Sequence, residues 1–438
     1  MHYKRKECKI GGLVKNLQKP NIPLSKELLS DIKSIGIDYI ITEFSQDDSF
    51  PGQRDSIDNL LETLSNADEV GVDVIATYVV FCKNKKDEDV IHYDNKPHGY
   101  WWHAENQSID RIKEAMKHKS FAGIFRDEPS DTDECFENIK KFRELYNGLG
   151  VKFDLNLFPN YTFVFNNNVN MWDTGRTFKE YVERYAQIND TIGVDFYPII
   201  FSDGSYIKNR MRTWTECLNT LLDLSHKYPE KDYKMFIQVT QHESYGVITP
   251  ETLSLQTYVS LIGGATDVRY FCLTDGDNPF NSFTNSPYTS DHNGYQHGLT
   301  HDVVNNFNND EKFKSFKDII TSLYISKIDY YINGVSKFNN IKQDEINKFV
   351  NQEQNGEMVV SIASDDENNY LLIVNSDFSS PLKLIVDDNR VKMLTQNKYK
   401  HQKAITINCC DVCVLRKSKY GKFKTLWNRF IKFIKKLF

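Results

Sequence analysis

Eight short apolar runs, each followed by a polar stretch long enough for a helix, most constrain the fold of the first 330 residues. The runs are rich in Ile, Val, Phe and Tyr. They read CKIGGLV (8–14), DYIITEF (38–44), VDVIATYVVF (72–81), FAGIF (121–125), KFDLNLF (152–158), IGVDFYPI (192–199), KMFIQV (234–239) and DVRYFCL (267–273). Strands that alternate with helices pair in parallel through right-handed crossovers. Eight such units predict an α/β protein with a (β/α)8 barrel rather than a doubly wound sheet.

Helix signals between the runs agree with this prediction. SKELLSDIKSIG (25–36), SIDNLLETLSNADEVG (56–71) and DECFENIKKFRELYNGLG (133–150) have helical periodicity, and the last two end in Gly where a helix C-cap is expected. No G-x-G-x-x-G follows the first strand and no G-x-x-x-x-G-K-[ST] occurs, so both nucleotide-binding interpretations lose their main support.

The sequence changes in character after about residue 340. Short strand-like segments such as YLLIVNSD and AITINCCDVCVLR are separated by turn residues without helices, which predicts a small antiparallel β domain. We therefore expect a barrel domain at residues 1–335, an antiparallel β domain at 336–416 and a basic amphipathic helix at 417–438.

The C-terminal segment KFKTLWNRFIKFIKKLF combines apolar side chains at helical spacing with Lys and Arg at the other positions. A basic helix with aromatic residues on its apolar face suits the surface of an anionic membrane, and residues 419–438 are the predicted contact. The alternative is a terminal helix that packs its apolar stripe against the rest of the protein.

Charge, apolar stretches and cysteine usage bear on the partners and the location of the protein. The formal net charge of −6 argues against nucleic acid. The N-terminus has no apolar run typical of a signal peptide, and no apolar stretch is long enough to span a membrane. The eight cysteines are scattered, which favours reduced thiols. We therefore expect a cytoplasmic protein, with the C-terminal segment as a peripheral contact to the inner face of the membrane.

The barrel prediction directs attention to the residues that end each apolar run, because the carboxyl ends of barrel strands converge on one face. The candidates at these positions are Glu43, Tyr78, Asp127, Glu128, Asn156, Asp195, Tyr197, Gln238, Glu243 and Asp275. Acids at a barrel mouth suit glycoside hydrolysis, which uses two carboxyl groups. The histidines lie mostly in predicted loops and no H-x-H pair ends a strand, so metal-assisted hydrolysis is weakened. The segment CCDVC (409–413) has no second Cys or His cluster nearby, and we expect neither a metal nor a cofactor.

Two tryptophans, Trp101 and Trp102 in GYWWHAENQ, lie in the loop after the third predicted strand, on the side of the expected active site. Their flat side chains could stack on a sugar ring, or they could close the barrel mouth structurally. The sequence leaves both roles open.

The segments GIFRDEP, GVDFYPI, FIQV and LIGGATDVRYFCLTDG, in this order, resemble a group of glycoside-hydrolase-like (β/α)8 proteins. This group is related to the clan of retaining glycosidases whose acid/base follows the fourth strand, and the resemblance covers roughly residues 8–330. It implies that Glu128 is the acid/base and that Asp127 replaces an Asn that holds the sugar 2-hydroxyl. Asp195 and Tyr197 match positions that shape the floor of the sugar site.

The sequence departs from this clan at the seventh strand. Gln238 stands where the clan has a nucleophilic Glu, and an amide cannot form the glycosyl ester. Glu243, Asp275 and Glu43 remain candidates for the second carboxylate.

Structural roles compete with the catalytic ones for the two acids after the fourth strand. Asp127 could cap the following helix, and Arg126 could pair with Glu128. An unpaired carboxylate is costly at the end of a buried strand, which favours a catalytic role for Glu128. Asp127 and partial burial would raise its pKa, as a general acid requires.

The sequence therefore predicts a glycoside hydrolase that cleaves an oligosaccharide or polysaccharide by carboxylate general acid catalysis. The substrate would lie across Trp101, Trp102, Tyr78 and Tyr197. The alternative is a non-catalytic carbohydrate-binding or membrane-recruited scaffold protein on a degenerate barrel, for which Gln238 is the best support.

Overall fold

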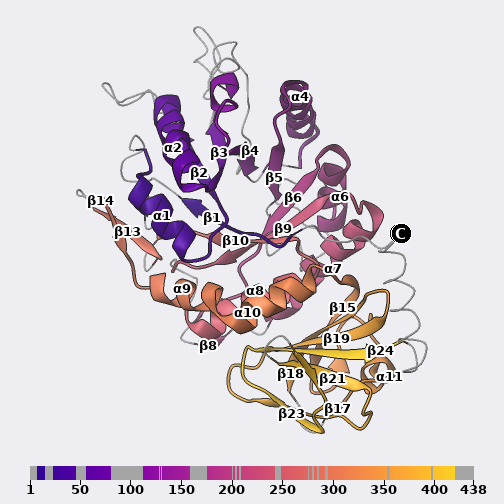
Figure 1. The fold of residues 1–438 in the computed structure, drawn as a ribbon. Helices are drawn as coiled ribbons and strands as arrows, with labels where there is room; N and C mark the ends of the chain where they lie inside the picture. The colour runs from indigo at the N-terminus through magenta and orange to yellow at the C-terminus, as the bar shows by residue number, and fades with distance from the viewer. Residues whose placement is uncertain are drawn as a thin grey trace, which may run out of the picture.

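A computed structural model gives the fold of the chain (Figure 1). It describes residues 7–14, 23–45, 56–79, 112–127, 129, 131–157, 175–199, 201–202, 205–206, 209–241, 248–274, 276–278, 281–283, 286–291, 294–352, 356–395 and 398–419.

Eight parallel strands close into a barrel, as the sequence predicts. In spatial order they are β1 (Ile10–Val14), β10 (Asp267–Phe271), β9 (Asp232–Gln238), β6 (Thr191–Asp195), β5 (Phe153–Leu157), β4 (Phe121–Asp127), β3 (Asp73–Val79) and β2 (Tyr39–Ser45). Each strand overlaps one of the eight apolar runs, so the (β/α)8 prediction is confirmed.

Helices surround the barrel (Figure 1). They are α1 (Lys26–Ser34), α2 (Ser56–Val70), α4 (Asp133–Leu149), α6 (Phe178–Ile188), α7 (Asn209–Lys227), α8 (Pro250–Ile262), α9 (His301–Asn309) and α10 (Glu311–Ile320). Gly71 and Gly150, directly after α2 and α4, both have a left-handed φ of 76°, as expected for helix ends. The N-cap of α4 is Thr132, whose side chain accepts from the backbone N–H of Cys135. The alternative role of Asp127 as the cap of this helix is therefore wrong.

Short hairpins extend two of the loops at the carboxyl ends of the strands. β7 (Phe201–Ser202) and β8 (Ser205–Tyr206) follow β6, whereas β11 (Gly276–Asn278), β12 (Asn281–Phe283), β13 (Tyr288–Asp291) and β14 (Gly294–His297) follow β10. The β13–β14 hairpin leads into α9 and so connects the last barrel strand to the helices that follow it.

The C-terminal part is antiparallel, as predicted. A seven-stranded sheet has the order β16 (Val335–Ser336), β15 (Tyr324–Ile332), β18 (Glu357–Ser364), β19 (Asn368–Asn375), β24 (Val412–Ser418), β21 (Val391–Thr395) and β22 (Lys398–Lys400). A three-stranded sheet contains β17 (Asn351–Gln352), β20 (Leu382–Ile385) and β23 (Ala404–Ile407), and the short helix α11 (Gln343–Asn347) precedes β17. Because β15 pairs with β18 from Tyr324 onward, the sheet starts before residue 336, and we propose a domain boundary near Leu323.

The interior of the barrel and its outer surface form separate apolar clusters. The interior cluster consists of Leu13, Tyr39, Ile41, Ile75, Phe125, Tyr197, Phe236 and Cys272. The outer cluster joins the strands to their surrounding helices and continues into β18 and β19 of the C-terminal sheet. Residues of the barrel interior therefore alternate with residues that face the helices, which fixes the side on which each polar residue lies.

Within the part of the chain that the structure describes, no helix is long and apolar enough to cross a membrane. The basic helix predicted at 417–438 does not start at residue 417, because β24 continues to Ser418. From residue 420 onward, the predicted helix lies outside the described residues.

Candidate active site

The fourth barrel strand carries the principal catalytic candidates. β4 ends at Asp127, whose register partner in β5 is Asn156. Phe125, two residues earlier, belongs to the interior cluster, so residue 127 occupies an interior register position. Glu128 lies outside the described residues, and its catalytic role stays a prediction.

The backbone directly after Glu128 is fixed by α6. The Tyr181 hydroxyl donates a hydrogen bond of 2.7 Å to the carbonyl oxygen of Pro129, and the side chain of Tyr181 is fully buried. A buried carbonyl that lost this donor would be left without a hydrogen bond, which is costly. The bond therefore restrains the segment that begins one residue after Glu128.

Two arginines of the α6 region hold the next part of the same segment. Nη1 of Arg176 and Nη1 of Arg184 donate to the carbonyl oxygen of Asp131 over 2.8 and 3.1 Å. Both guanidinium groups also lie 2.7 Å from Oδ1 of Asp133. The hydrogen bonds from Arg176 and Arg184 lower the pKa of the exposed Asp133 carboxyl. The turn from β4 into α4 is thus held by main-chain and side-chain contacts together.

The side chains of four predicted substrate-binding residues are described, and all four are buried at the carboxyl ends of neighbouring strands. They are Asn156, Asp195, Tyr197 and Gln238. Gln238 is the register partner of Phe271 in β10, and the ring of Phe271 lies 5.2 Å from that of Tyr197, centroid to centroid. The structure therefore brings the ends of β6, β9 and β10 together, as the barrel predicts.

Gln238, for which the sequence resemblance implies the position of a nucleophilic Glu, is held by local hydrogen bonds. Its side-chain Nε2 donates to the carbonyl oxygen of Thr240 over 2.9 Å. Its backbone N–H donates to Oε1 of Gln256 over 3.0 Å, and Nε2 of Gln256 donates back to the Gln238 carbonyl over 3.2 Å. These bonds give Gln238 a structural role at the end of β9. Its contact with substrate stays a prediction.

A group of buried charged side chains lies inside the barrel. None of these residues was among the site candidates predicted from the sequence. Arg269 pairs with Asp154 and also donates from Nε to the Tyr39 hydroxyl over 2.9 Å. Nζ of Lys234 lies 3.2 Å from Oδ2 of Asp154 and 3.3 Å from Oδ2 of Asp267. Two cations thus face two carboxylates, so the charges within this group balance. In the sequence, this group is visible only as charged residues within the apolar runs KFDLNLF, KMFIQV and DVRYFCL, where Asp154, Lys234 and Arg269 stand among apolar residues.

Asp154 and Tyr39 of this group are not proton donors to a substrate at neutral pH. Burial acts to raise the pKa of Asp154, but the charges of Arg269 and Lys234 outweigh it and lower this pKa to about 2. Burial raises the pKa of the Tyr39 hydroxyl well above its usual value. Asp154 is therefore ionised and Tyr39 neutral over the physiological range.

Gly193 allows Arg269 of this charged group to lie close to Asn156, a predicted site residue. A Cβ atom at Gly193 would lie 2.8 Å from Oδ1 of Asn156 and 3.2 Å from Nη1 of Arg269. The first of these distances is too short for a carbon atom without movement of the Asn156 side chain. Asn156 and Arg269 thus share the space that the missing side chain leaves.

The remaining candidates cannot be placed in the site. Trp101, Trp102, Glu128, Glu243 and Asp275 lie outside the described residues, and only the backbone is described for Glu43, Tyr78 and Asp127. Their predicted roles stay predictions. None of the predicted site residues belongs to the one group of three possible metal ligands in the described ranges, Asp31, His297 and His301.

No family model and no curated protein matches the chain. Solved structures do. Gan42B, a GH42 β-galactosidase, matches with a TM-score of 0.58 and 8% identity over 96% of this chain and 99% of that chain. A catalytic mutant of Gan42B from G. stearothermophilus matches with a TM-score of 0.54, also at 8% identity and with the same coverage.

A further match is Abp-WT, a GH27 β-L-arabinopyranosidase from Geobacillus stearothermophilus. It has a TM-score of 0.53 and 9% identity over 95% of this chain and 97% of that chain. The fold is a glycosidase-like TIM barrel. This agrees with the resemblance found in the sequence, and at such low identity the likeness concerns the fold alone.

Proposed function

We propose that the chain is a glycoside hydrolase in which Glu128 is the general acid. The observation that carries this proposal is the position of Glu128, directly after the fourth strand of a closed eight-stranded barrel. The contacts of α6 with Pro129 and Asp131 support it, because a catalytic group must be held in place to act. Glu128 would protonate the glycosidic oxygen as the bond to the anomeric carbon breaks.

The role of the second carboxylate decides whether hydrolysis retains or inverts the configuration at the anomeric carbon. Gln238 offers no carboxylate for a covalent intermediate, so the partner of Glu128 must come from another position. Asp195 is a buried carboxylate at the end of β6, and Glu43, Glu243 and Asp275 are the other candidates. A carboxylate that takes a proton from water while that water attacks the anomeric carbon would give inversion.

Hydrolysis assays on the full chain test this proposal. The fold neighbours suggest 4-nitrophenyl β-D-galactoside and 4-nitrophenyl β-L-arabinopyranoside as the first probes in a panel of aryl glycosides. Glu128→Gln should lower kcat by about 10²- to 10⁴-fold, the usual contribution of general acid–base catalysis. The loss should be larger for an alkyl glycoside than for the nitrophenyl glycoside, because nitrophenolate leaves without much help from an acid.

Glu134→Gln is the matched control, since Glu134 is an exposed acid in the first turn of α4. It should leave kcat unchanged. Equal losses in the two variants, or an unchanged kcat in Glu128→Gln, would contradict the role of Glu128. NMR of the first-formed sugar anomer separates an inverting enzyme from a retaining one.

The alternative is a carbohydrate-binding protein without turnover, which the structural hydrogen bonds of Gln238 favour. Calorimetry with the same glycosides separates it from an enzyme. A binding protein would bind ligand with equal affinity before and after Glu128→Gln and would hydrolyse none of the panel.

Recruitment of a cytoplasmic protein to a membrane is a separate proposal that rests on the basic C-terminal sequence. Deletion of residues 419–438 should abolish sedimentation with phosphatidylglycerol vesicles and leave hydrolysis in solution intact. Equal sedimentation of both proteins would reject the membrane contact.

A further inference from the structure

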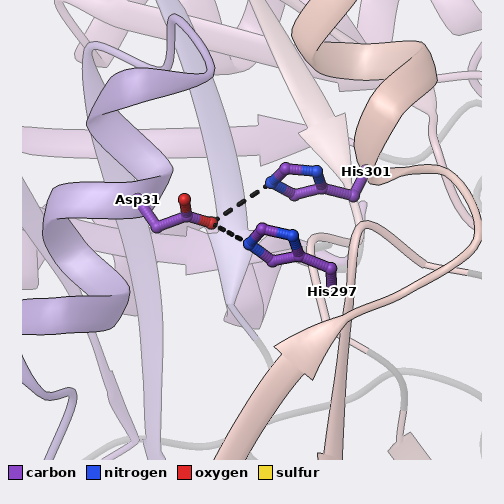
Figure 2. Close-up of side chains that lie close together, drawn as sticks. All are labelled: Asp31, His297 and His301. Carbon is purple, nitrogen blue, oxygen red and sulfur yellow. Dashed lines mark hydrogen bonds and ion pairs between the residues drawn. The ribbon is translucent and has the colours of Figure 1, made fainter.

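Three side chains that are far apart in the sequence converge outside the barrel (Figure 2). Asp31 lies on α1, His297 is the last residue of β14 and His301 is the first residue of α9. Nε2 of His297 lies 2.9 Å from Oδ2 of Asp31, and Nε2 of His301 lies 3.2 Å from the same oxygen. Two imidazole nitrogens therefore lie within hydrogen-bond distance of the same carboxylate oxygen.

The surroundings fix one imidazole and leave the other open to solvent. The side chain of His301 is 7% exposed, whereas that of His297 is 59% exposed and that of Asp31 32% exposed. The two imidazole rings stack with centroids 3.6 Å apart, and the ring of Tyr288 packs edge-on at 5.5 Å from His301. The group is therefore preformed on its buried side and accessible on its outer side.

The spacing suits a small divalent cation. Zn²⁺ binds imidazole nitrogen and carboxylate oxygen at 2.0–2.2 Å, so neighbouring ligand atoms in a tetrahedral site lie about 3.3–3.5 Å apart. The two nitrogen-to-oxygen distances of 2.9 and 3.2 Å are close to this value, and all three ligand atoms lie within 4.8 Å of one another. A modest expansion would admit the ion.

A second carboxylate lies in the position expected for a partner of a metal ligand. Nδ1 of His301 lies 3.3 Å from Oδ1 of Asp302. A hydrogen on Nδ1 that donates to Asp302 leaves the lone pair of Nε2 available to a metal, and metal-binding histidines commonly have such a partner. The tautomer that Asp302 favours is thus the one that ligation requires.

We propose that Asp31, His297 and His301 bind Zn²⁺ or a similar divalent transition-metal ion, with water at the fourth position. Two imidazoles select such ions over Mg²⁺ and Ca²⁺, which prefer oxygen ligands. On binding, the exposed ring of His297 turns out of the stack so that its lone pair points to the metal. The ion joins α1, which follows the first barrel strand, to α9, which follows the last, and it is independent of the proposed hydrolysis.

The test uses the full chain without an affinity tag, stripped with EDTA and titrated with Zn²⁺ alone. One equivalent should bind, and Zn²⁺ should raise Tm whereas Mg²⁺ should not. His297→Gln and Asp31→Asn should each weaken binding by more than about a hundredfold. Asp302→Asn should weaken it by about 10- to 100-fold, as loss of a ligand's hydrogen-bond partner does.

His118→Gln is the control, because His118 contacts one carboxylate, Asp68, at 2.9 Å and lies outside the group. It should bind Zn²⁺ like the wild type. Circular dichroism verifies that His297→Gln, a change at an exposed residue, remains folded.

Co²⁺ absorption separates this site from the eight cysteines of the chain. Nitrogen and oxygen ligands give d–d bands without thiolate charge transfer, and these bands should disappear in His297→Gln. A thiolate charge-transfer band, unchanged Zn²⁺ binding in His297→Gln, or no binding by the wild type would overturn the proposal.

Discussion

The carboxylate of Asp154 shows how single charged residues are accommodated inside this barrel. It is almost fully buried and lies between Arg269 and Lys234. The ring centroids of Phe125 and Phe236 lie 5.5 and 5.4 Å from the guanidinium carbon of Arg269. Taking such charges out of water is expensive, so each depends on its partner to remain in the interior.

Asp154→Asn should therefore destabilise the protein by about 3–5 kcal/mol, because it leaves two buried cations with one carboxylate fewer. Urea unfolding measures this loss. The control is Asp190→Asn, which removes an exposed partner of Arg143 and should cost less than about 1 kcal/mol. Similar losses in the two variants would contradict the role assigned to Asp154.

The stability difference between wild type and Asp154→Asn should also depend on pH. The pKa of Asp154 is about 2 in the folded protein and 3.8 ordinarily, so the ionised carboxylate stabilises the fold above about pH 4. That contribution is lost as the pH falls towards 2, and the difference should shrink by roughly 2 kcal/mol. A difference that stays constant between pH 4 and pH 2 would contradict the lowered pKa.

Sequence reasoning located residues at strand ends more readily than residues within strands. Asn156, Asp195 and Gln238 could be selected because the end of an apolar run marks the barrel mouth. Arg269 and Asp154 interrupt apolar runs and are 115 residues apart, so no local pattern pairs them. No local pattern pairs Asp31 with His301 either, because they are 270 residues apart.

The helix α6 is the element that links the fold to the candidate site. Its N-terminus is closed by a capping box between Thr177 and Glu180, and its buried face includes Tyr181. The capping box fixes where the helix begins. Tyr181 then meets Pro129 at a defined position in the turn after β4.

Tyr181→Phe should cost about 1–3 kcal/mol, because the carbonyl oxygen of Pro129 stays buried without its donor. If Glu128 is the general acid, kcat for the best substrate of the panel should fall while KM changes little. Thr177→Ala is the matched control: loss of the cap costs about 1 kcal/mol but leaves the contact with Pro129 in place. A decrease in kcat in both variants would indicate a general effect of stability rather than positioning of Glu128.

Elements with a long periodic pattern were predicted, and short ones were not. The eight barrel strands and the helices α1, α2 and α4 each have enough residues for a period to be visible. The hairpins β7–β8, β11–β12 and β13–β14 have strands of two to four residues, too few to establish alternation. β15 falls within residues 1–335, which were predicted as the barrel domain, because nothing in its local sequence distinguishes antiparallel from parallel pairing.

The barrel and the C-terminal sheet share one continuous core. The helix α8 is buried on nearly all sides, because it contacts β9 and β10 of the barrel and also β18 and β19 of the sheet. The Ser361 hydroxyl donates to the carbonyl oxygen of Ile262 at the end of α8 over 2.7 Å. Nε2 of His226 on α7 donates to the carbonyl oxygen of Ile325 in β15 over 2.8 Å. A helix that is buried on nearly all sides needs both partners to remain covered.

We therefore expect the barrel and the sheet to unfold together, in a single calorimetric transition. Leu371→Ala tests this coupling, because Leu371 is fully buried in the cluster of the C-terminal sheet that lies apart from the barrel core. The change should cost about 2–5 kcal/mol, which for a chain of this length lowers Tm by roughly 2–5 °C. The whole transition should move.

The control is Leu299→Ala, the same substitution at a leucine that is 77% exposed, and it should leave Tm almost unchanged. Two transitions, of which only one moves in Leu371→Ala, would show that the domains unfold independently. In that case α8 would be stabilised sufficiently by the barrel alone, and the sheet could be removed without exposing the core of the barrel. A single shifted transition instead means that damage to the sheet reaches the barrel, and with it the turn that carries Glu128.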